Sequence, residues 1–432
     1  MTNIAIMYWL NFVNLCYMKT VIKNISKLVQ NDDNMIKFRA GSDMNHLNTI
    51  SNAFIEIEDG LISDYGDMDD WKGIDDWNQT KIIDAEEGIL FPSYCDSHTH
   101  LVYAESRENE FNDRLNGLSY QEIAEKGGGI LNSALKIAEI DEDLLYEKSL
   151  ERLNNLILKG TGAIEIKSGY GLNLESELKI LRVINKLKEN SLVSIKSTFL
   201  GAHAVPIDYK GKKSEYINLI INKMLPAIKS ENLADYIDVF CEKGYFNVED
   251  TLKILQAGQK IGLKGKTHVN QFNSIGGVKA SIENNCISVD HLEVMNEEDF
   301  QAFNNSSCIA TLLPACSFFL GIPYSPAKEF IKRNIPFNLA SDYNPGSSPS
   351  GNMNFVSSLG SIKLKLNAEE VTNATTINGA YAMEFEKELG TISVGKKANF
   401  FITKPIPSYQ YLHYSFGDNL IDKIFLEGKQ IK

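Results

Sequence analysis

The middle of the chain alternates short apolar runs, each typical of a buried strand, with longer segments of helical periodicity. This alternation is characteristic of βα units and a parallel sheet. Eight such runs are present, which is the number that closes a (β/α)8 barrel. They are ILFPSYCDSHTH, AIEIKSGYG, SIKSTFLGAH, YIDVFCEKG, GKTHVNQF, CISVDHLEV, CIATLLPAC and PFNLASDYN. The sequence therefore predicts an α/β fold built on a TIM-like barrel.

The segments between these runs have the pattern of surface helices. In 174–188, large apolar residues recur at spacings of three and four with Lys and Glu between them, namely Leu174, Leu178, Leu181, Ile184 and Leu187. This spacing puts one apolar stripe on one face of a helix. Asn173 precedes the stripe and is a typical N-cap residue.

Both ends of the chain differ from this middle part. Residues 18–90 and the stretch after about residue 390 contain short alternating runs separated by polar turns, which indicates β structure. We expect the barrel to span 91–374. Residues 18–90 and 375–432, the latter beginning with a helix, are expected to form a small β-sandwich-like domain from both chain ends.

The first 17 residues, MTNIAIMYWLNFVNLCY, are apolar but lack the basic start and the small-residue cleavage site of a signal peptide. The run is also too short to span a bilayer. Because a strand-like start follows Met18, residues 1–17 are interpreted as a non-native or disordered extension. Neither export nor membrane binding is expected.

Charge and cysteine usage exclude other classes. The formal net charge is −13, and the 43 Lys and Arg residues are scattered, whereas nucleic-acid binding needs clustered basic residues. The 6 cysteines form no Cys-x-x-Cys pair. Free thiols of this kind suit a reducing cytosol, so a cytoplasmic location is expected. Homodimers are common among such barrels, and the sequence leaves the oligomeric state open.

The histidines are concentrated at the ends of the predicted strands. Of the 7 histidines in the chain, only His46 and His413 lie elsewhere. The others are His98, His100, His203, His268 and His291. Catalytic groups of a barrel lie at the C-terminal ends of its strands. The distribution therefore predicts a functional site at this rim.

A metal site explains the pattern best. His98 and His100 are two residues apart on one strand, so both imidazoles project to the same face and can reach one ion. His268 on the fifth strand and Asp342 after the eighth complete a ligand set of three nitrogens and a carboxylate. Each residue alone has a structural explanation, for example a turn-forming Asp before Asn-Pro-Gly. Together they predict a single-metal hydrolase.

Longer motifs around these residues resemble the amidohydrolase superfamily and, more closely, the imidazolonepropionases of histidine degradation. The resemblance extends from Met18 to the C-terminus. It is carried by FPSYCDSHTHLVYAESRENEF at 91–111, SYQEIAEKGGGI at 119–130, EIKSGYGL at 165–172, TFLGAHAVP at 198–206, DVFCEKGYF at 238–246, VDHLE at 289–293 and SDYNPGSSP at 341–349.

The resemblance implies the barrel with a small β domain, and one zinc or iron ion per subunit. It also implies a reaction, the hydrolysis of the cyclic amide of 4-imidazolone-5-propanoate to N-formimidoyl-L-glutamate, the third step of histidine degradation to glutamate. Asp342 is expected to move the proton from water to the leaving nitrogen, and His291 to stabilise the oxyanion or hold the water. Gln271 belongs to the same catalytic group, and the division of roles stays open.

Substrate contacts follow from the resemblance as well. Arg107 is expected to bind the propionate carboxylate, because a guanidinium makes bidentate pairs. The other implied contacts are Tyr120, Tyr170, His203, Gln271, Asn344, Gly346 and Ser347. One departure from the family pattern is Asn270, where a smaller or acidic residue is expected, and its role is open.

Alternatives remain at this stage. The same metal chemistry deaminates purine or pyrimidine rings, although Arg107 and the loop 344–347 favour a substrate with a carboxylate. A barrel kept only as a binding protein usually loses its metal ligands, which are all present here. Lys167 and Lys196 lie on strands and invite a Schiff-base or carbamylated-lysine interpretation, but structural roles are favoured for both.

Overall fold

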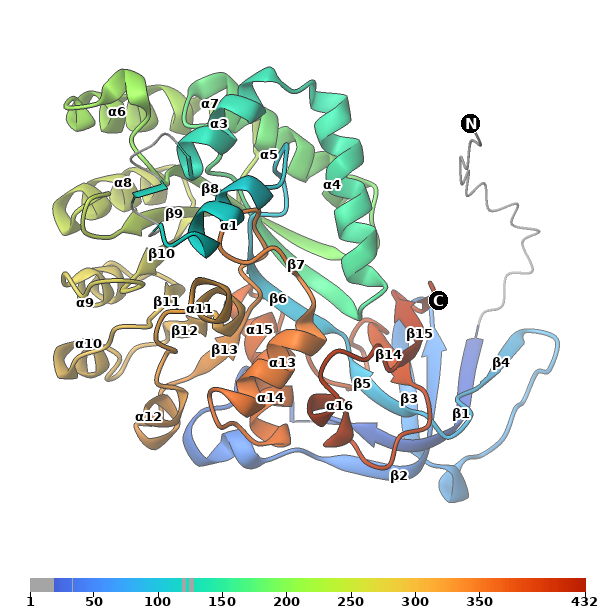
Figure 1. Ribbon diagram of the computed structural model, residues 1–432. Coiled ribbons are helices and arrows are strands. Elements are labelled where there is room, and N and C mark those ends of the chain that lie inside the picture. The colour runs from blue at the N-terminus through green and yellow to red at the C-terminus, as the bar shows by residue number, and fades with distance from the viewer. Residues whose placement is uncertain (1–18, 33, 119–121, 124–127) are drawn as a thin grey trace.

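The computed structural model describes residues 19–32, 34–118, 122–123 and 128–432. Its central element is a barrel of eight parallel strands surrounded by helices (Figure 1). All eight predicted strands are confirmed. They are β6 (Tyr94–Thr99), β7 (Thr161–Lys167), β8 (Ser194–Ala202), β9 (Tyr236–Cys241), β10 (Lys264–Val269), β11 (Ser288–His291), β12 (Ile309–Leu312) and β13 (Phe337–Leu339).

The helices lie between and after these strands. They are α1 (Glu108–Leu115), α3 (Ile130–Glu139), α4 (Glu142–Ile157), α5 (Leu174–Glu189), α6 (Lys213–Leu219), α7 (Leu225–Glu231), α8 (Val248–Lys260), α9 (Gly277–Glu283), α10 (Glu297–Ala302), α11 (Pro314–Leu320), α12 (Ala327–Lys332), α13 (Met353–Ile362), α14 (Ala368–Thr375), α15 (Ile377–Ala382) and α16 (Tyr411–Tyr414). In α5 the predicted cap is present, because Asn173 Oδ1 accepts the Ser176 N–H at 2.9 Å. The apolar stripe of α5 is buried, which anchors the helix to the barrel.

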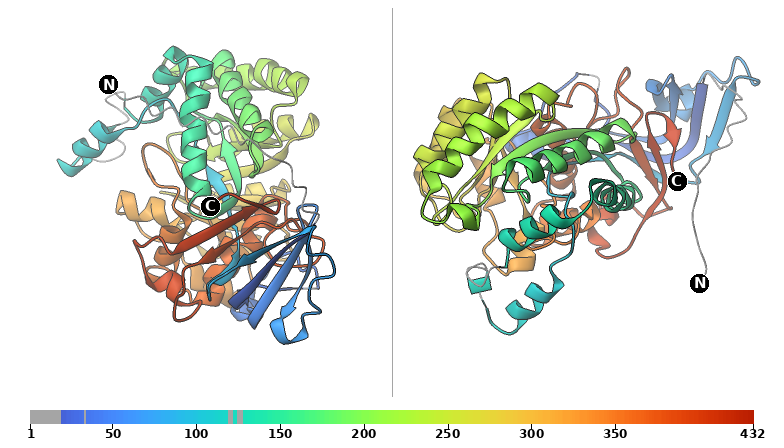
Figure 2. Two further views of the ribbon diagram at one scale, coloured as in Figure 1. Left: turned by 90° about the vertical axis from the view of Figure 1, so that its right-hand side faces the viewer. Right: turned by 90° about the horizontal axis from the view of Figure 1, so that it is seen from above.

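A second sheet combines the two ends of the chain. Its hydrogen-bonded order is β16-β15-β14-β5-β1-β2-β3, and β4 also pairs with β1. The blue strands of the N-terminal part and the red strands of the C-terminal part lie side by side next to the barrel (Figure 2). The strands are β1 (Lys19–Val29), β2 (Thr49–Glu58), β3 (Leu61–Asp67), β4 (Thr80–Asp84), β5 (Ile89–Pro92), β14 (Phe400–Thr403), β15 (Ile421–Leu426) and β16 (Lys429–Gln430).

The barrel closes where its first and last strands meet. Asp342 N–H donates to the His98 carbonyl at 3.0 Å, and His100 N–H donates to the Tyr343 carbonyl at 2.8 Å. Nearby, Asp96 accepts hydrogen bonds from the backbone N–H and the hydroxyl of Ser341. These bonds set the chain after β13 directly against the end of β6. Asp342 therefore lies beside the His98–His100 pair, although 242 residues separate Asp342 from His100 in the sequence.

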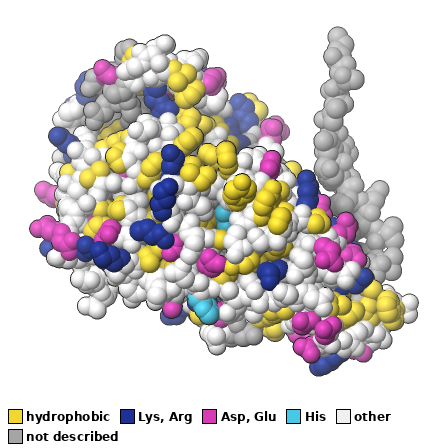
Figure 3. Space-filling view, turned by 60° about the horizontal axis from the view of Figure 1, so that its bottom comes forward, with side chains coloured by type: hydrophobic (Ala, Val, Ile, Leu, Met, Phe, Trp, Pro, Cys, Tyr) yellow, Lys and Arg dark blue, Asp and Glu magenta, His cyan; other side chains and the backbone are white. Residues whose placement is uncertain are grey.

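The basic side chains on one face of the molecule are scattered, as the sequence indicated. On the face that Figure 3 shows, Lys and Arg side chains lie scattered among Asp and Glu without one continuous basic surface. No helix among the described residues is long and apolar enough to cross a membrane. The cysteines of the described part, Cys95, Cys241, Cys286, Cys308 and Cys316, are buried and free.

His413 provides a test of the fold away from the active site. It is buried against Thr372, whose Oγ1 lies 3.1 Å from His413 Nε2. Burial lowers the pKa of His413 to about 4. A histidine in the unfolded chain has a pKa near 6.5, so it becomes protonated below that pH. In the folded chain His413 becomes protonated only near pH 4. The contribution of His413 to stability is therefore present above pH 6.5 and is lost as the pH falls toward 4.

We expect wild-type protein to lose about 3 kcal/mol more stability than His413→Gln between pH 6.5 and pH 4. Urea unfolding of both proteins without metal, at several pH values, measures this difference. Parallel pH profiles for the two proteins would contradict the assignment.

Candidate active site

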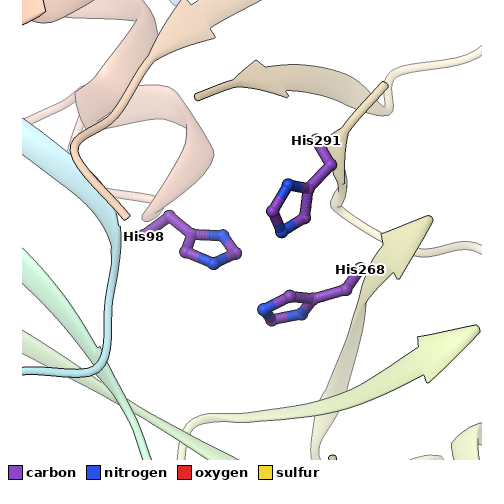
Figure 4. A group of neighbouring side chains, drawn as sticks. All are labelled: His98, His268 and His291. Atoms are coloured by element: carbon purple, nitrogen blue, oxygen red, sulfur yellow. The ribbon is translucent and has the colours of Figure 1, made fainter. Parts of the chain in front are cut away.

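Five polar side chains converge at the C-terminal mouth of the barrel. The rings of His98, His268 and His291 point toward one another from β6, β10 and β11 (Figure 4). Potential ligand atoms of these three residues lie within 4.8 Å of one another, and the same holds for His98, His100 and Asp342. All five side chains are almost completely buried. The strands thus bring together every residue of the predicted metal site.

The donor atoms fit a cation. His268 Nε2 and His100 Nε2 face each other at 3.3 Å. Asp342 Oδ1 lies 3.5 Å from His98 Nε2 and 3.7 Å from His100 Nε2. Among the described residues, His98 Nε2 has no hydrogen-bond partner. A buried nitrogen without a partner is costly, whereas three imidazoles and a carboxylate around one point are a usual set for a divalent metal ion.

Burial keeps these histidines neutral, as metal ligands must be. Removal from water is the largest cause that lowers the pKa of His98, His100 and His268 well below the usual value. The charge of Lys167, and the repulsion that arises when two neighbouring imidazoles are protonated together, lower these pKa values further. Neutral imidazoles offer a lone pair to a metal near neutral pH.

Two aspartates contact the rings of the ligands from below. Asp290 Oδ2 lies 2.6 Å from His98 Nδ1. Asp238 Oδ2 lies 3.0 Å from His268 Nδ1, in contact with the ring but not aligned as a hydrogen bond. A carboxylate at Nδ1 fixes the tautomer and directs Nε2 toward the metal. The motifs contain both aspartates, but sequence reasoning assigned them no role.

The loop after β13 presents Asp342 to the site. Asp342 has a left-handed backbone with φ of 52°. Asn344 holds this turn, since its Nδ2 donates to the Asp342 carbonyl and its Oδ1 accepts the N–H groups of Gly346 and Ser347 at 2.7–2.8 Å. The Ser347 hydroxyl reaches Asp342 Oδ2 at 3.4 Å. Burial raises the pKa of Asp342 to about 6, and the charge of His291 opposes that rise.

His291 is held by a buried glutamate. His291 Nδ1 lies 3.4 Å from Glu293 Oε1, which also accepts the hydroxyl of Ser317. Burial alone would lower the pKa of His291, but the charge and hydrogen bond of Glu293 outweigh it and raise the pKa. An imidazole that donates from this position is suited to stabilising a developing negative charge. Gln271 Nε2 donates to Cys316 Sγ at 3.5 Å on the same side.

Arg107 approaches from the start of α1. Glu110 Oε2 accepts from Arg107 Nε at 2.7 Å and lies 2.6 Å from Nη2. The other oxygen of Glu110 accepts from Gly129 N–H and Asn132 Nδ2, at the start of α3. A Cβ on Gly346 would lie 2.1 Å from Arg107 Nη1. Glycine at 346 is therefore what lets the guanidinium pack against the Asp342 loop.

The remaining predicted contacts line one small pocket that is partly open to solvent. Its volume of about 30 Å³ holds about one water molecule, so a larger ligand can enter only when the wall opens. His203 Nδ1 lies 3.0 Å from the Gly169 carbonyl, and its ring stacks on His100 with centroids 5.2 Å apart. Tyr170 packs against both of these rings. The cavity is lined by His100, Arg107, Ile130, Tyr170, His203, Phe240, His268, Gln271, His291, Asp342, Asn344 and Ser347.

Among the described residues, two predicted site residues are absent from the lining of the pocket, namely His98 and Gly346. His98 lies beneath the cavity and Gly346 contacts Arg107, whereas Tyr120 lies outside the described residues. Sequence reasoning missed Ile130 and Phe240, two apolar residues of the wall that carry no chemical signal.

Two positions with open or structural roles are also placed. Asn270 Nδ2 donates to the Val294 carbonyl and to Asp299, so it anchors the end of β10 to the segment after β11 and to α10. Lys196 is absent from the cavity lining and lies 4.9 Å from the Phe385 ring centre.

Curated relatives match almost the whole chain. The imidazolonepropionase of Flavobacterium johnsoniae is 55% identical over 414 residues, which cover 96% of this chain and 100% of the relative. That of Christiangramia forsetii is 52% identical with the same coverage, and that of Clostridium tetani is 39% identical over 94% of this chain and 97% of the relative.

Solved structures show the same architecture at much lower identity. The guanine deaminase of E. coli superposes with a TM-score of 0.72 at 12% identity, covering 96% of this chain and 99% of that one. An adenosine deaminase from Xanthomonas campestris gives 0.70 at 13% identity, with 95% and 92% covered. At such identities the likeness concerns the fold alone and does not favour deamination.

A family model agrees with the curated relatives. The model of the amidohydrolase family matches residues 89–431, which include the whole barrel and every described residue around the cavity. The chain therefore belongs to the amidohydrolase family and, within it, to the imidazolonepropionases.

Proposed function

We propose that the chain hydrolyses the cyclic amide C–N bond of 4-imidazolone-5-propanoate and yields N-formimidoyl-L-glutamate. The observation that carries this proposal is that Arg107 lines the same pocket as His100, His268 and Asp342. A substrate there would have its carboxylate bound by a guanidinium and its ring carbonyl at the metal ligands. High identity to imidazolonepropionases over the whole chain supports the same reaction.

The amidohydrolase family is metal-dependent, and this chain has the residues to bind a metal. We assign His98, His100, His268 and Asp342 as the ligands of one zinc or iron ion per subunit. Nitrogen and carboxylate donors accommodate either metal. When bound, the metal supplies a water acidic enough to attack near neutral pH.

The positions of the protein residues indicate which of them transfers protons and which stabilises charge. Asp342 accepts the proton of the attacking water, whose oxygen forms a bond to the ring carbonyl carbon. His291 stabilises the negative charge that develops on the carbonyl oxygen. As the C–N bond breaks, Asp342 returns the proton to the leaving nitrogen. Gln271 is an amide and cannot exchange protons in this way, so its role is to donate or accept hydrogen bonds.

Substrate orientation is assigned to the opposite wall. Arg107 binds the propionate carboxylate, and Tyr170, His203 and Ser347 border the ring. Asn344 and Gly346 shape the loop that carries Asp342, and Asn344 bonds that loop directly. Tyr120 is retained as a proposed contact from its motif alone.

The decisive assay uses freshly generated 4-imidazolone-5-propanoate. Loss of imidazolone absorbance together with the appearance of formimidoylglutamate supports the proposal. The competing function is deamination of a purine or pyrimidine ring by the same residues. Release of ammonia from a nucleobase, with imidazolonepropionate untouched by metal-loaded protein, would replace the proposal.

Metal removal should abolish this activity reversibly. After dialysis against a chelator, we expect turnover to fall about 100-fold or more and to return when about one zinc or iron ion per chain is restored. His268→Ala should neither hold the metal nor recover, whereas the remote variant His413→Gln should behave as wild type. Full turnover with less than about a tenth of an ion per chain would contradict a metal mechanism.

The buried free cysteines support a cytoplasmic location, because such thiols persist in reducing compartments. Homodimer formation stays a prediction that sedimentation of the purified protein would test.

A further inference from the structure

The barrel interior beneath the metal ligands contains charged side chains. In most barrels this layer is filled by branched apolar residues. Here it holds three carboxylates and two ammonium groups, all at most 1% exposed, namely Glu165, Lys167, Asp238, Lys266 and Asp290. Burying charges is expensive, and such groups persist in protein interiors only when they are paired. Because an apolar layer would cost less free energy, we look for the role of these charges in the function of the site.

Lys167 occupies the centre of this layer. Its Nζ lies 2.8 Å from Asp238 Oδ2 and 3.4 Å from Asp290 Oδ2, and it donates to Glu165 Oε1 at 2.6 Å. Burial by itself lowers the pKa of Lys167, but the charges of the three carboxylates outweigh it and raise the pKa. Lys167 is thus a permanent cation that contacts both aspartates beneath the ligands.

The two aspartates have the same arrangement of contacts. In each, Oδ1 accepts from a nearby donor, the Ser288 hydroxyl for Asp290 and the His268 backbone N–H for Asp238. In each, Oδ2 lies between the ammonium of Lys167 and Nδ1 of one ligand histidine. One cation therefore contacts the same oxygens that orient His98 and His268.

We propose that Lys167 is a positioning residue of the metal centre, which fixes Asp238 and Asp290 and thereby directs Nε2 of His268 and His98 toward the ion. The inference rests on the ligand set proposed above. Without the ammonium, two carboxylates that share one cation would repel each other and turn away from the imidazoles. Both ligand rings would then lose the contact that orients them.

Lys266 is a matched control. It is as buried as Lys167 and also pairs with Glu165, but its Nζ donates to Glu165 Oε2 and the Ser97 carbonyl. No hydrogen bond or ion pair joins Lys266 to Asp238 or Asp290 among the described residues. Replacing either lysine by Met removes one buried cation from the same layer. Only the Lys167 variant removes the contact beneath the ligands.

The test compares zinc affinity and metal-free stability in Lys167→Met and Lys266→Met. We expect competition with a chelator to give a zinc Kd raised about 10–100-fold in Lys167→Met, as for other residues that support metal ligands. Lys266→Met should change the Kd less than about threefold, within the effect expected when no ligand contact is lost. Both variants should lose similar thermal stability without metal. The visible spectrum of the Co²⁺ form should change only in Lys167→Met.

Equal zinc Kd values in the two variants, or an unchanged Kd in Lys167→Met, would overturn the proposal. If Lys167→Met does not fold, Lys167→Gln and Lys266→Gln are compared instead, because each removes the positive charge while its amide still donates one hydrogen bond to the buried carboxylates. His268→Ala separates this inference from the ligand assignment. Unchanged zinc affinity in His268→Ala would show that the ligand set is wrong, whereas loss there with wild-type affinity in Lys167→Met would overturn only the role of Lys167.

Discussion

Asp342→Asn should lower kcat by about 10³- to 10⁴-fold, while the protein still binds metal. The carboxylate has two tasks in the proposed reaction, taking a proton from water and returning it to the ring nitrogen. An amide of the same shape can perform neither. The three histidine ligands remain in this variant. Asn344 bonds the Asp342 carbonyl and backbone N–H groups of the loop, so the loop keeps these hydrogen bonds.

Steady-state kinetics together with metal analysis check this expectation. The comparison variant is His268→Ala, in which activity and metal should be lost together. Ser347→Ala is the milder control, because it removes only the hydroxyl 3.4 Å from Asp342 Oδ2. If Asp342→Asn kept more than about a tenth of the wild-type kcat with metal bound, another residue would have to carry the proton.

The second large effect is expected at Arg107. Arg107→Met should lower kcat/KM by about 10²- to 10³-fold, mainly through KM, because removing one partner of a buried charge pair costs about 2–5 kcal/mol. Arg107 is only 8% exposed, so little water would compensate a carboxylate left without it. The wild type should prefer the carboxylate substrate strongly over its propionamide analogue. Arg107→Met should lose that preference.

Gly346→Ala provides a matched test that leaves the arginine in place. The added Cβ would meet Arg107 Nη1, and the guanidinium cannot easily withdraw because Glu110 holds its other edge. We therefore expect the KM of Gly346→Ala to rise toward that of Arg107→Met, with metal content unchanged. A KM within threefold of wild type in Arg107→Met would show that the propionate is bound elsewhere.

Much of the architecture could be predicted because it depends on the order of residues within short segments. The period of apolar residues indicated eight strands and the helices between them, and Asn173 marked the start of α5. The His-x-His pair indicated a shared face because alternate residues of a strand point the same way. The resemblance then supplied the substrate contacts, of which all but Tyr120 fall within the described residues.

Other features depend on contacts between distant segments. Nothing near Asp238 or Asp290 in the sequence tells which histidine each contacts. The Asp238–His268 contact depends on the pairing of β9 with β10, and the Asp290–His98 contact depends on the closing of the barrel, which brings β6 opposite β11. The wall residues Ile130 and Phe240 look like any other apolar residues of the core. The side-chain pairing of Arg107 with Glu110 follows only once α1 is formed.

The sequence alone determined the fold class, the rim where chemistry takes place and the identity of the metal-ligand candidates, because periodicity and strand-end residues are local properties. Only the tertiary structure decided how the charges are balanced. The barrel places Lys167 between two aspartates from other strands, so a lysine favoured for a structural role lies directly beneath the metal ligands. Such balance arises from closing the sheet on itself, which brings the inward side chains of non-adjacent strands into contact.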